Sequence, residues 1–145
     1  MDEQERSERI AAHIQTDAYL HYLGARIEEI RPGYSRVSLV VRAEMCNFHG
    51  MVHGGIVFGL GDIAFAAASN SHGQTAVALN VSISYLSPAW PGECLVAEAQ
   101  ERHREGRIGL YDIVVTAKEN GRLVAQSQAM VYRKKEWFIP PPPNT

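Results

Sequence analysis

Apolar and polar residues alternate in several short stretches of the chain, which is the pattern of half-buried β-strands. Two such stretches lie within residues 25–42, on either side of the turn signal Arg31-Pro32-Gly33. In the second stretch, one face consists of Val37, Leu39 and Val41. Four more stretches follow, at residues 75–86, 95–103, 108–117 and 123–133. The short, turn-forming links between these four predict antiparallel pairing.

Three stretches show helical patterns instead. Residues 3–15 predict a charged amphipathic helix, and Asp17 is placed to cap a second short helix that ends at Gly24. A third stretch begins near Gly54 and is apolar on every side, which is typical of a buried helix, with Gly73 as its stop. One long buried helix between two strands and four strands predicts an α+β fold, in which a single antiparallel sheet wraps around that helix.

The strand predicted at residues 75–86 has two distinct faces. Its apolar members Val77, Leu79, Val81, Ile83 and Tyr85 alternate with Ala78, Asn80, Ser82 and Ser84. This alternation predicts a half-buried strand, because successive side chains of a strand point to opposite faces.

The composition is that of one globular domain. The chain has 145 residues, of which 46% are hydrophobic and 21% are charged. We therefore expect a single domain over residues 1–145, with an N-terminal helical segment at residues 1–23 and a proline-rich tail at residues 135–145. Such a tail either frays or docks Trp137 and Phe138 on a neighbouring molecule.

Charge and segment hydrophobicity exclude several classes of partner. A net charge of -2 provides no electrostatic surface for nucleic acid. The first nine residues are acidic and polar, unlike a secretory signal, so we expect a cytoplasmic protein. Residues 50–69 are too weakly hydrophobic to span a membrane. Two cysteines, Cys46 and Cys94, imply no disulfide framework in that compartment.

Asp62 is the only formally charged side chain between Glu44 and Glu93, and it lies inside the predicted buried helix. Burying an unpaired carboxylate is costly, so a fold that places one here neutralises it, pairs it or uses it in chemistry. The structural alternative is a carboxylate held by hydrogen bonds to residues such as Ser69 or Ser84. Asp62 is therefore the first candidate for a functional side chain.

The start of the same helix is the second candidate. Gly54 and Gly55 leave the backbone N–H groups of a helix N-terminus open to an anion or a developing oxyanion, although two glycines also suit close helix–sheet packing. Asp62 follows Gly54 by eight residues, or about 12 Å along a helix. If both groups act on one carbonyl, they must come from two antiparallel copies of the helix, which predicts a two-fold dimer with shared sites.

Two further polar residues precede this helix. Asn47 is either a turn residue or part of the site. His49 and His53 lie four residues apart, but Gly50 separates them in a predicted loop and no zinc motif is present. We expect no metal and no organic cofactor.

The combined spacing resembles a known family. Its motif residues are Asn47-Phe48-His49-Gly50-Met51-Val52-His53-Gly54-Gly55, then Asp62 and Ser69-Asn70-Ser71, then Tyr85-Leu86-Ser87-Pro88, Arg102-His103 and Gly109-Leu110-Tyr111-Asp112-Ile113. Residues 17–134 resemble the hotdog-fold acyl-CoA thioesterases, and most closely the phenylacetic-acid-degradation (PaaI-type) branch. The resemblance implies a sheet wrapped around a central helix, dimers with a continuous sheet, and pairing of dimers into homotetramers.

The resemblance also implies roles for individual residues. The N–H of Gly54 would polarise the thioester carbonyl, Asn47 would orient the thioester or the water, and Asp62 of the other subunit would be the base or nucleophile, while His53 shapes the loop. Some relatives hold the water with a Ser or Thr at the position of Ala78, and here Asn80 or Ser82 would replace it. Basic residues that would bind the phosphates of coenzyme A, if they are not simply solvated surface charges, include Arg102, Arg104 and Arg133.

The substrates implied by the resemblance are aryl-acetyl thioesters of coenzyme A, such as phenylacetyl-CoA or hydroxyphenylacetyl-CoA. Three alternatives remain open from the sequence. One is a medium-chain acyl-CoA thioesterase, the second is a non-catalytic protein of the same fold that binds acyl-CoA, and the third is a dehydratase or hydratase of the same fold that acts on acyl-CoA.

Overall fold

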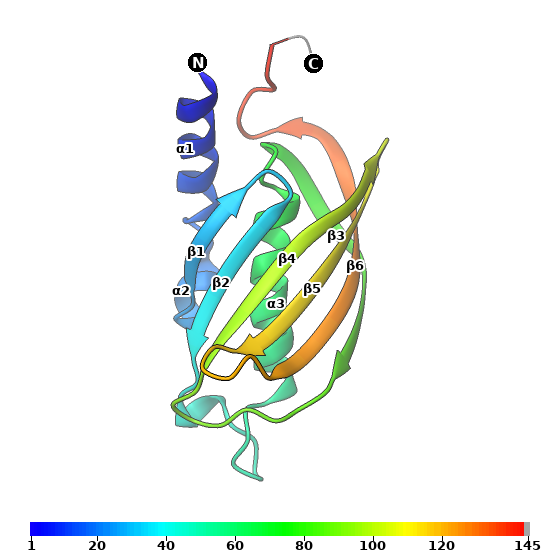
Figure 1. Cartoon of the computed structure of the whole chain (residues 1–145). Helices are drawn as coiled ribbons and strands as arrows, with labels where there is room; N and C mark the ends of the chain where they lie inside the picture. The colour runs from blue at the N-terminus through cyan, green and yellow to red at the C-terminus, as the bar shows by residue number, and fades with distance from the viewer. Residues whose placement is uncertain (144–145) are drawn as a thin grey trace.

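The computed structural model describes residues 1–143 (Figure 1). Two helices come first, α1 (Glu3–Ile14) and α2 (Ala18–Leu23), and a longer helix, α3 (Gly54–Ser69), follows a 3-10 turn, η1 (Ala43–Met45). The strands are β1 (Arg26–Arg31), β2 (Tyr34–Val40), β3 (Gln74–Tyr85), β4 (Cys94–Glu105), β5 (Ile108–Ala117) and β6 (Leu123–Trp137). These elements match the predicted stretches, with differences of a few residues at their ends.

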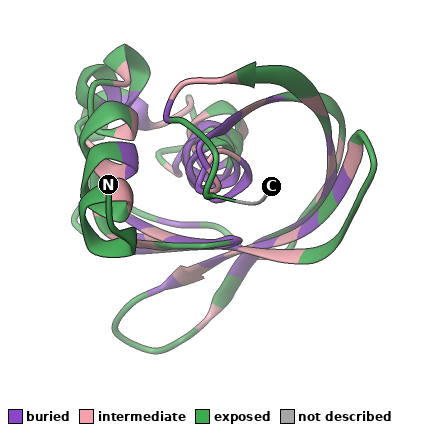
Figure 2. Cartoon of the chain, turned by 90° about the horizontal axis from the view of Figure 1, so that it is seen from above, coloured by how far each residue is buried: buried purple, intermediate pink, exposed green. Residues whose placement is uncertain are grey.

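The strands form one antiparallel sheet in the order β1-β2-β4-β5-β6-β3. The sheet curves around α3, which lies against its concave face, while α1 stands on the side of β1 (Figures 1 and 2). Strands β1 and β3 are the two edges of the sheet. The predicted α+β architecture, a sheet wrapped around one helix, is confirmed.

The core lies between α3 and the inner face of the sheet. The alternation predicted for β2 is confirmed, because Val37, Leu39 and Val41 are all buried. On α3, Leu60, Ala64 and other apolar side chains belong to the same buried cluster. Both caps of α2 also agree with the prediction: the Asp17 carboxylate accepts a hydrogen bond from the Tyr19 N–H at the N-cap, and Gly24 ends the helix as its C-cap with a φ of 77°.

The prediction that α3 is buried on every side was wrong. Gly55, Phe58, Asp62 and Ala66 are exposed in the single chain, and their spacing places them along one face of the helix. We call these four residues the α3 stripe. The helix also ends earlier than predicted, with Asn70 as its C-cap, while Gly73 adopts a φ of 86° in the turn that leads to β3.

The uniform alternation predicted for β3 was also wrong. A register shift between Ala78 and Asn80 inserts Leu79 as an extra residue against β6. Ala78 therefore pairs with the buried Val131, and after the shift Val81 and Ile83 face inward. Val77 and Leu79 are instead 45% and 53% exposed.

The segment that follows β6 is not a frayed tail up to Ile139. Strand β6 continues to Trp137, so the predicted tail boundary at residue 135 lies inside the strand. The Phe138 ring stacks on His13 of α1 with ring centroids 4.8 Å apart, and Ile139 is buried. Arg6 of α1 donates a hydrogen bond to the Pro140 carbonyl. The last two residues of the predicted tail, 144–145, lie outside the described residues.

Candidate active site

Backbone hydrogen bonds of the loop before α3 hold the first residues of this helix in position. The His53 N–H donates to the Met45 carbonyl at 2.8 Å, and the Val52 N–H donates to the Ala89 carbonyl at 2.8 Å. The His53 ring is the N-cap of α3, since its Nδ1 accepts a hydrogen bond from the Gly55 N–H at 3.2 Å. His53 therefore fixes the geometry of the helix N-terminus.

Gly54 is the first residue of α3, and its N–H has no hydrogen-bond acceptor within residues 1–143. The Tyr85 ring lies close to it, because a Cβ added at Gly54 would come within 3.3 Å of Tyr85 Cε1. A glycine is thus suited to the space between the helix and this ring. The free N–H and the positive end of the helix dipole together form a donor for an oxyanion.

Asn47 shapes the loop that leads to Gly54. Its side-chain Oδ1 accepts a hydrogen bond from the His49 N–H at 2.9 Å, and its carbonyl accepts one from the Gly50 N–H at 3.0 Å. The structure therefore gives Asn47 the turn role that the sequence left open. Asn47 also lines the same cavity of about 370 Å³ as Gly54, together with Met51, Val52, Val57, Tyr85, Leu86, Ser87, Pro88 and Val124.

Asp62 lies in the middle of the α3 stripe and has no hydrogen bond or ion pair among the described residues. The structural alternative fails, because the Ser69 hydroxyl donates to the Ala66 carbonyl and Ser84 lies on the outer face of β3. Partial burial among apolar side chains is the larger cause that raises the pKa of Asp62, and the negative charge of Asp17 is the second. A carboxylate with a raised pKa and no partner is suited to accept a proton.

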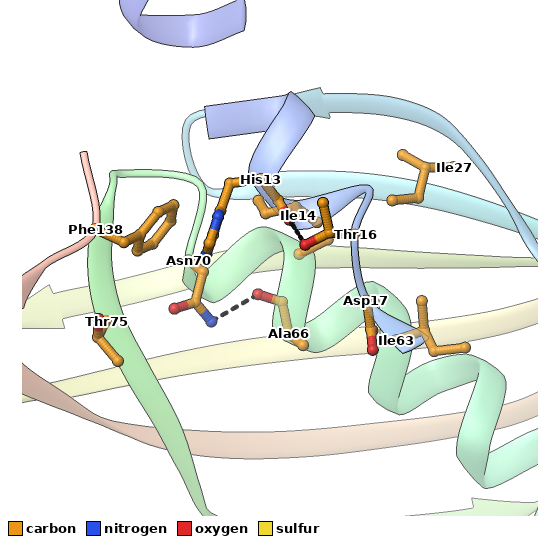
Figure 3. Close-up of a pocket in the computed structure, with 11 residues that line it drawn as sticks. His13, Ile14, Thr16, Asp17, Ile27, Ile63, Ala66, Asn70, Thr75 and Phe138 are labelled. Atoms are coloured by element: carbon orange, nitrogen blue, oxygen red, sulfur yellow. Dashed lines mark hydrogen bonds between the residues drawn. The ribbon is translucent and has the colours of Figure 1, made fainter. Parts of the chain in front are cut away.

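No pattern in the sequence connects Asp17 with Asp62. Asp17 points toward α3 beside Ile63, in a cavity of about 310 Å³ between α1 and α3 (Figure 3). Ala66, the last residue of the α3 stripe, lines the same cavity. The negative charge of Asp17 at this place makes it a candidate for tuning the acidity of Asp62.

Asp62 and Gly54 do not meet within one chain. They lie on one uninterrupted helix, eight residues apart, and are thus separated by about 12 Å. A single carbonyl cannot contact both groups. The geometric premise for a site shared between two chains therefore stands.

Strand β3 places its three candidate residues on different faces. Ala78 pairs with the buried Val131 and so lies on the inner side of the strand, although it is exposed in the single chain. Asn80 and Ser82 pair with Met130 and Gln128, which alternate with the buried residues of β6, so both lie on the outer face. The structure does not bring Asn80 or Ser82 to Asp62 of the same chain.

The three candidate arginines also separate. Arg102 points to the outer face, where its Nε donates to the Asp112 carboxylate at 2.6 Å. Arg104 and Arg133 lie on the inner side, and the charge of Arg104 adds to burial in lowering the pKa of Arg133. These two arginines lie at the end of the sheet near Gly73. Gly54 lies at the other end, where it contacts Tyr85. From Ala76, the partner of Arg133, to Tyr85 is roughly 30 Å along β3.

The described part of the chain has neither a cluster of metal-binding side chains nor a membrane-spanning helix. Within residues 1–143, no group of three or more His, Cys, Asp or Glu side chains is placed to hold a metal ion. No helix there is both long and apolar enough to cross a membrane.

Comparison with known proteins identifies the family of this site. Residues 49–124 match the sequence model of the thioesterase superfamily. The chain belongs to this superfamily. A putative esterase from Archaeoglobus fulgidus is 44% identical over 126 residues, which cover 87% of this chain and 81% of the relative. The acyl-coenzyme A thioesterase PaaI of Escherichia coli is 40% identical over 108 residues, which cover 74% of this chain and 77% of the relative.

Solved structures agree with this assignment. The structure of the E. coli PaaI protein from the phenylacetic acid degradation operon matches with a TM-score of 0.87 and 35% identity, covering 92% of this chain and 96% of that one. A hypothetical thioesterase protein from Streptococcus pneumoniae, crystallised with coenzyme A, matches with a TM-score of 0.72 and 26% identity, covering 76% and 88%. The protein is therefore a hotdog-fold thioester hydrolase of the PaaI type.

Proposed function

We propose that the protein hydrolyses aryl-acetyl thioesters of coenzyme A to the free acid and coenzyme A, at sites shared between two subunits. The observation that carries this proposal is the arrangement on α3. An N–H without an acceptor starts the helix, and a carboxylate without a partner follows on an exposed face about 12 Å away. Two antiparallel copies of α3 would bring each N–H beside the carboxylate of the other copy.

The groups of such a site would divide the reaction between them. The Gly54 N–H would bind the thioester carbonyl oxygen and stabilise the negative charge that develops there. Asp62 of the partner subunit, in its ionised form, would take a proton from water as the water oxygen bonds to the carbonyl carbon. The C–S bond then breaks, the electron pair leaves with the coenzyme A sulfur, and the sulfur receives the proton. The alternative, direct attack by the carboxylate, uses the same ionised form.

Two apolar surfaces favour the dimer. The α3 stripe exposes Phe58, and the edge strand β3 exposes Val77 and Leu79 beside unpaired backbone groups. An exposed edge strand with apolar side chains is suited to pairing with a second chain. We infer a dimer in which β3 edges meet and α3 helices lie antiparallel, and in which dimers pair into tetramers.

This dimer would also complete a site for coenzyme A. Within one chain, Arg104 and Arg133 lie at the opposite end of the sheet from Gly54. With α3 antiparallel across a two-fold axis, the end of the partner's sheet that carries these two arginines lies toward Gly54. Arg104 and Arg133 of the partner subunit are therefore our candidates for binding the phosphates of coenzyme A. Arg102, paired with Asp112 on the outer face, is the weaker candidate.

The choice of acyl group rests on the relative and on the cavity at Gly54. The similar E. coli PaaI protein comes from a phenylacetic acid degradation operon. The cavity of about 370 Å³ beside Gly54 is lined by apolar side chains that include Tyr85, Leu86 and Pro88. Its volume is within the range of small-molecule sites and suits an aromatic ring.

A substrate panel tests the proposal. Release of coenzyme A would be followed with a thiol reagent for phenylacetyl-CoA, hydroxyphenylacetyl-CoA, octanoyl-CoA and acetyl-CoA. We expect the highest kcat/KM for the two aryl-acetyl thioesters. A higher value for octanoyl-CoA would replace the aryl-acetyl assignment with a medium-chain one. Binding of every thioester without release of coenzyme A would overturn the hydrolytic function.

The same assay tests the proposed base. Asp62→Asn should lower kcat by at least about 100-fold, because a general base or nucleophile is lost. The variant should still fold and bind acyl-CoA, since it removes a partly buried charge without changing side-chain volume. A folded Asp62→Asn protein with the parent kcat would make the carboxylate structural.

A further inference from the structure

A small hollow lies between α3 and the inner face of the sheet, beside Asp62. Besides Asp62 it is lined by Phe58, Gly61, Phe65, Val81, Ile113 and Ser127. Its volume of about 10 Å³ is close to the smallest space that holds one water molecule. The two polar side chains of its lining, Asp62 and Ser127, come from α3 and β6.

Ser127 is an unusual residue at this position. It occupies an inward place on β6, between the buried Ala125 and Ala129, and only 6% of its surface is exposed. No hydrogen-bond partner of its hydroxyl lies within the described residues. Because no fully buried side-chain nitrogen or oxygen of the described residues lacks a partner, the Ser127 oxygen is within reach of solvent and can bind a water molecule.

The other buried serines provide a comparison. The hydroxyls of Ser35, Ser69 and Ser71 donate to the carbonyls of α3 residues, at 2.5, 3.3 and 2.6 Å respectively. The Ser35 hydroxyl ties β2 to α3, the Ser71 hydroxyl ties the turn after α3 to the helix, and the Ser69 bond lies within the helix. Ser127 makes no such bond, and its hydroxyl opens into the hollow that Asp62 also lines.

We propose that Ser127 and Asp62 together bind the water that hydrolyses the thioester, an inference that rests on the proposed function. The water would donate one hydrogen bond to the carboxylate and the other to Ser127 Oγ. This leaves a lone pair of the water oxygen free to attack a carbonyl held at Gly54 of the partner subunit. As the new C–O bond forms, the proton passes to Asp62 and the C–S bond breaks with its electron pair on sulfur.

The inner face of β3 offers no hydroxyl beside Asp62 of the same chain, because Tyr85 lies at the Gly54 end of the strand. Its inward residues near Asp62 are Ala78, Val81 and Ile83, and Asn80 and Ser82 lie on the outer face. Ser127 is the hydroxyl that the neighbouring strand β6 contributes to the same space. It therefore fills the water-holding role for which the sequence analysis considered Asn80 and Ser82.

Three substitutions separate a hydroxyl role from a packing role. Ser127→Ala removes the hydroxyl, Ser127→Cys keeps the size but bonds water weakly, and Ser127→Thr keeps the hydroxyl at the cost of one methyl group. We expect Ser127→Ala and Ser127→Cys to lower kcat on phenylacetyl-CoA by at least about tenfold, because a polar group that positions the reacting water is lost. The KM of both variants should stay within about twofold of the parent value. Thr should retain kcat within about threefold.

The controls make each outcome decisive. Ser38→Ala removes a strand hydroxyl that bonds Glu28 on the outer face, and it should leave kcat unchanged. Thermal unfolding of each variant shows that it is folded. A parent-like kcat for Ser127→Ala or Ser127→Cys would overturn the inference. An active Ser127→Cys protein together with a folded but inactive Ser127→Thr protein would also overturn it, because that result indicates a packing role.

Asp62→Asn in the same series distinguishes the two levels of the argument. If Asp62→Asn is inactive while the Ala and Cys variants of Ser127 are fully active, the water site is wrong and the proposed function stands. If Asp62→Asn keeps the parent kcat, the proposed mechanism itself fails.

Discussion

The acidity of Asp62 is set by residues that are distant in the sequence. From the sequence alone, burial would raise its pKa and hydrogen bonds would lower it, so the sign was open. The structure gives no hydrogen bond to the carboxylate within residues 1–143, and both burial and the charge of Asp17 raise the pKa. Because the ionised form is the active one, activity should fall as the pH is lowered, with an apparent pKa above the ordinary Asp value of 3.8.

Asp17→Asn tests this electrostatic link. Removing the negative charge lowers the pKa of Asp62, so the acid limb of kcat/KM should move to lower pH. An Asn keeps the cap on α2, which now comes from the Asp17 carboxylate. Asp2→Asn, at the N-cap of α1, is the matched control and should leave the profile in place. An unchanged limb in Asp17→Asn would show that the two carboxylates are not coupled.

Asn47 offers a second test at this scale. Its Oδ1 holds the loop through the His49 N–H, while its amide N–H groups are free to act on the thioester or water. Asn47→Asp keeps the acceptor and loses those donors, whereas Asn47→Ala loses both. Both variants should lower kcat by about 10- to 1,000-fold, but the melting temperature should fall more for Ala. If the Asn47→Asp variant has the parent kcat, Asn47 acts only as a turn residue.

The elements were largely predictable because their signals are local. Alternation of side chains identified the strands, and Asp17 and Gly24 identified the bounds of α2. The bulge at Leu79 was not predictable, because it depends on the register between β3 and β6. The helix stop was placed wrongly for a similar reason, since Gly73 is needed by the turn that packs against Arg6 and Ile139.

Gly73→Ala tests that packing. At a φ of 86° an alanine is strained, and its Cβ would lie 2.7 Å from Arg6 Nη2 and 3.2 Å from the Ile139 carbonyl oxygen. We expect a loss of at least about 2 kcal/mol in the free energy of unfolding. Gly92→Ala has the same backbone strain without a nearby atom, so it should cost only about 1 kcal/mol. Equal losses in urea unfolding would contradict the packing argument.

At the scale of the whole molecule, the sequence located Gly54, Asp62 and the need for two helices, because one helix fixes their separation. It did not locate Asp17, Tyr85 or Ser127 in the site. Those residues reach it through the folding of α2, β3 and β6 around α3. One signal was visible for Ser127, a polar residue between the apolar residues Ala125 and Ala129 on the inner face of β6.

The central claim is that each active site combines Gly54 of one subunit with Asp62 of its partner. Gly54→Pro removes the N–H at the first helical position, where proline is tolerated, and the extended backbone of His53 suits a following proline. Gly54→Ala keeps the N–H and serves as its control for contact with Tyr85. Alone, Gly54→Pro and Asp62→Asn should each be nearly inactive.

Mixing these two inactive variants is the most direct measurement. A hybrid dimer has one intact site and one doubly defective site, so an equal mixture with free subunit exchange should recover about a quarter of the parent kcat. Differently tagged chains that purify together would show that exchange took place. Recovery near that level is the result that the shared site predicts. Exchange without any recovery would contradict it.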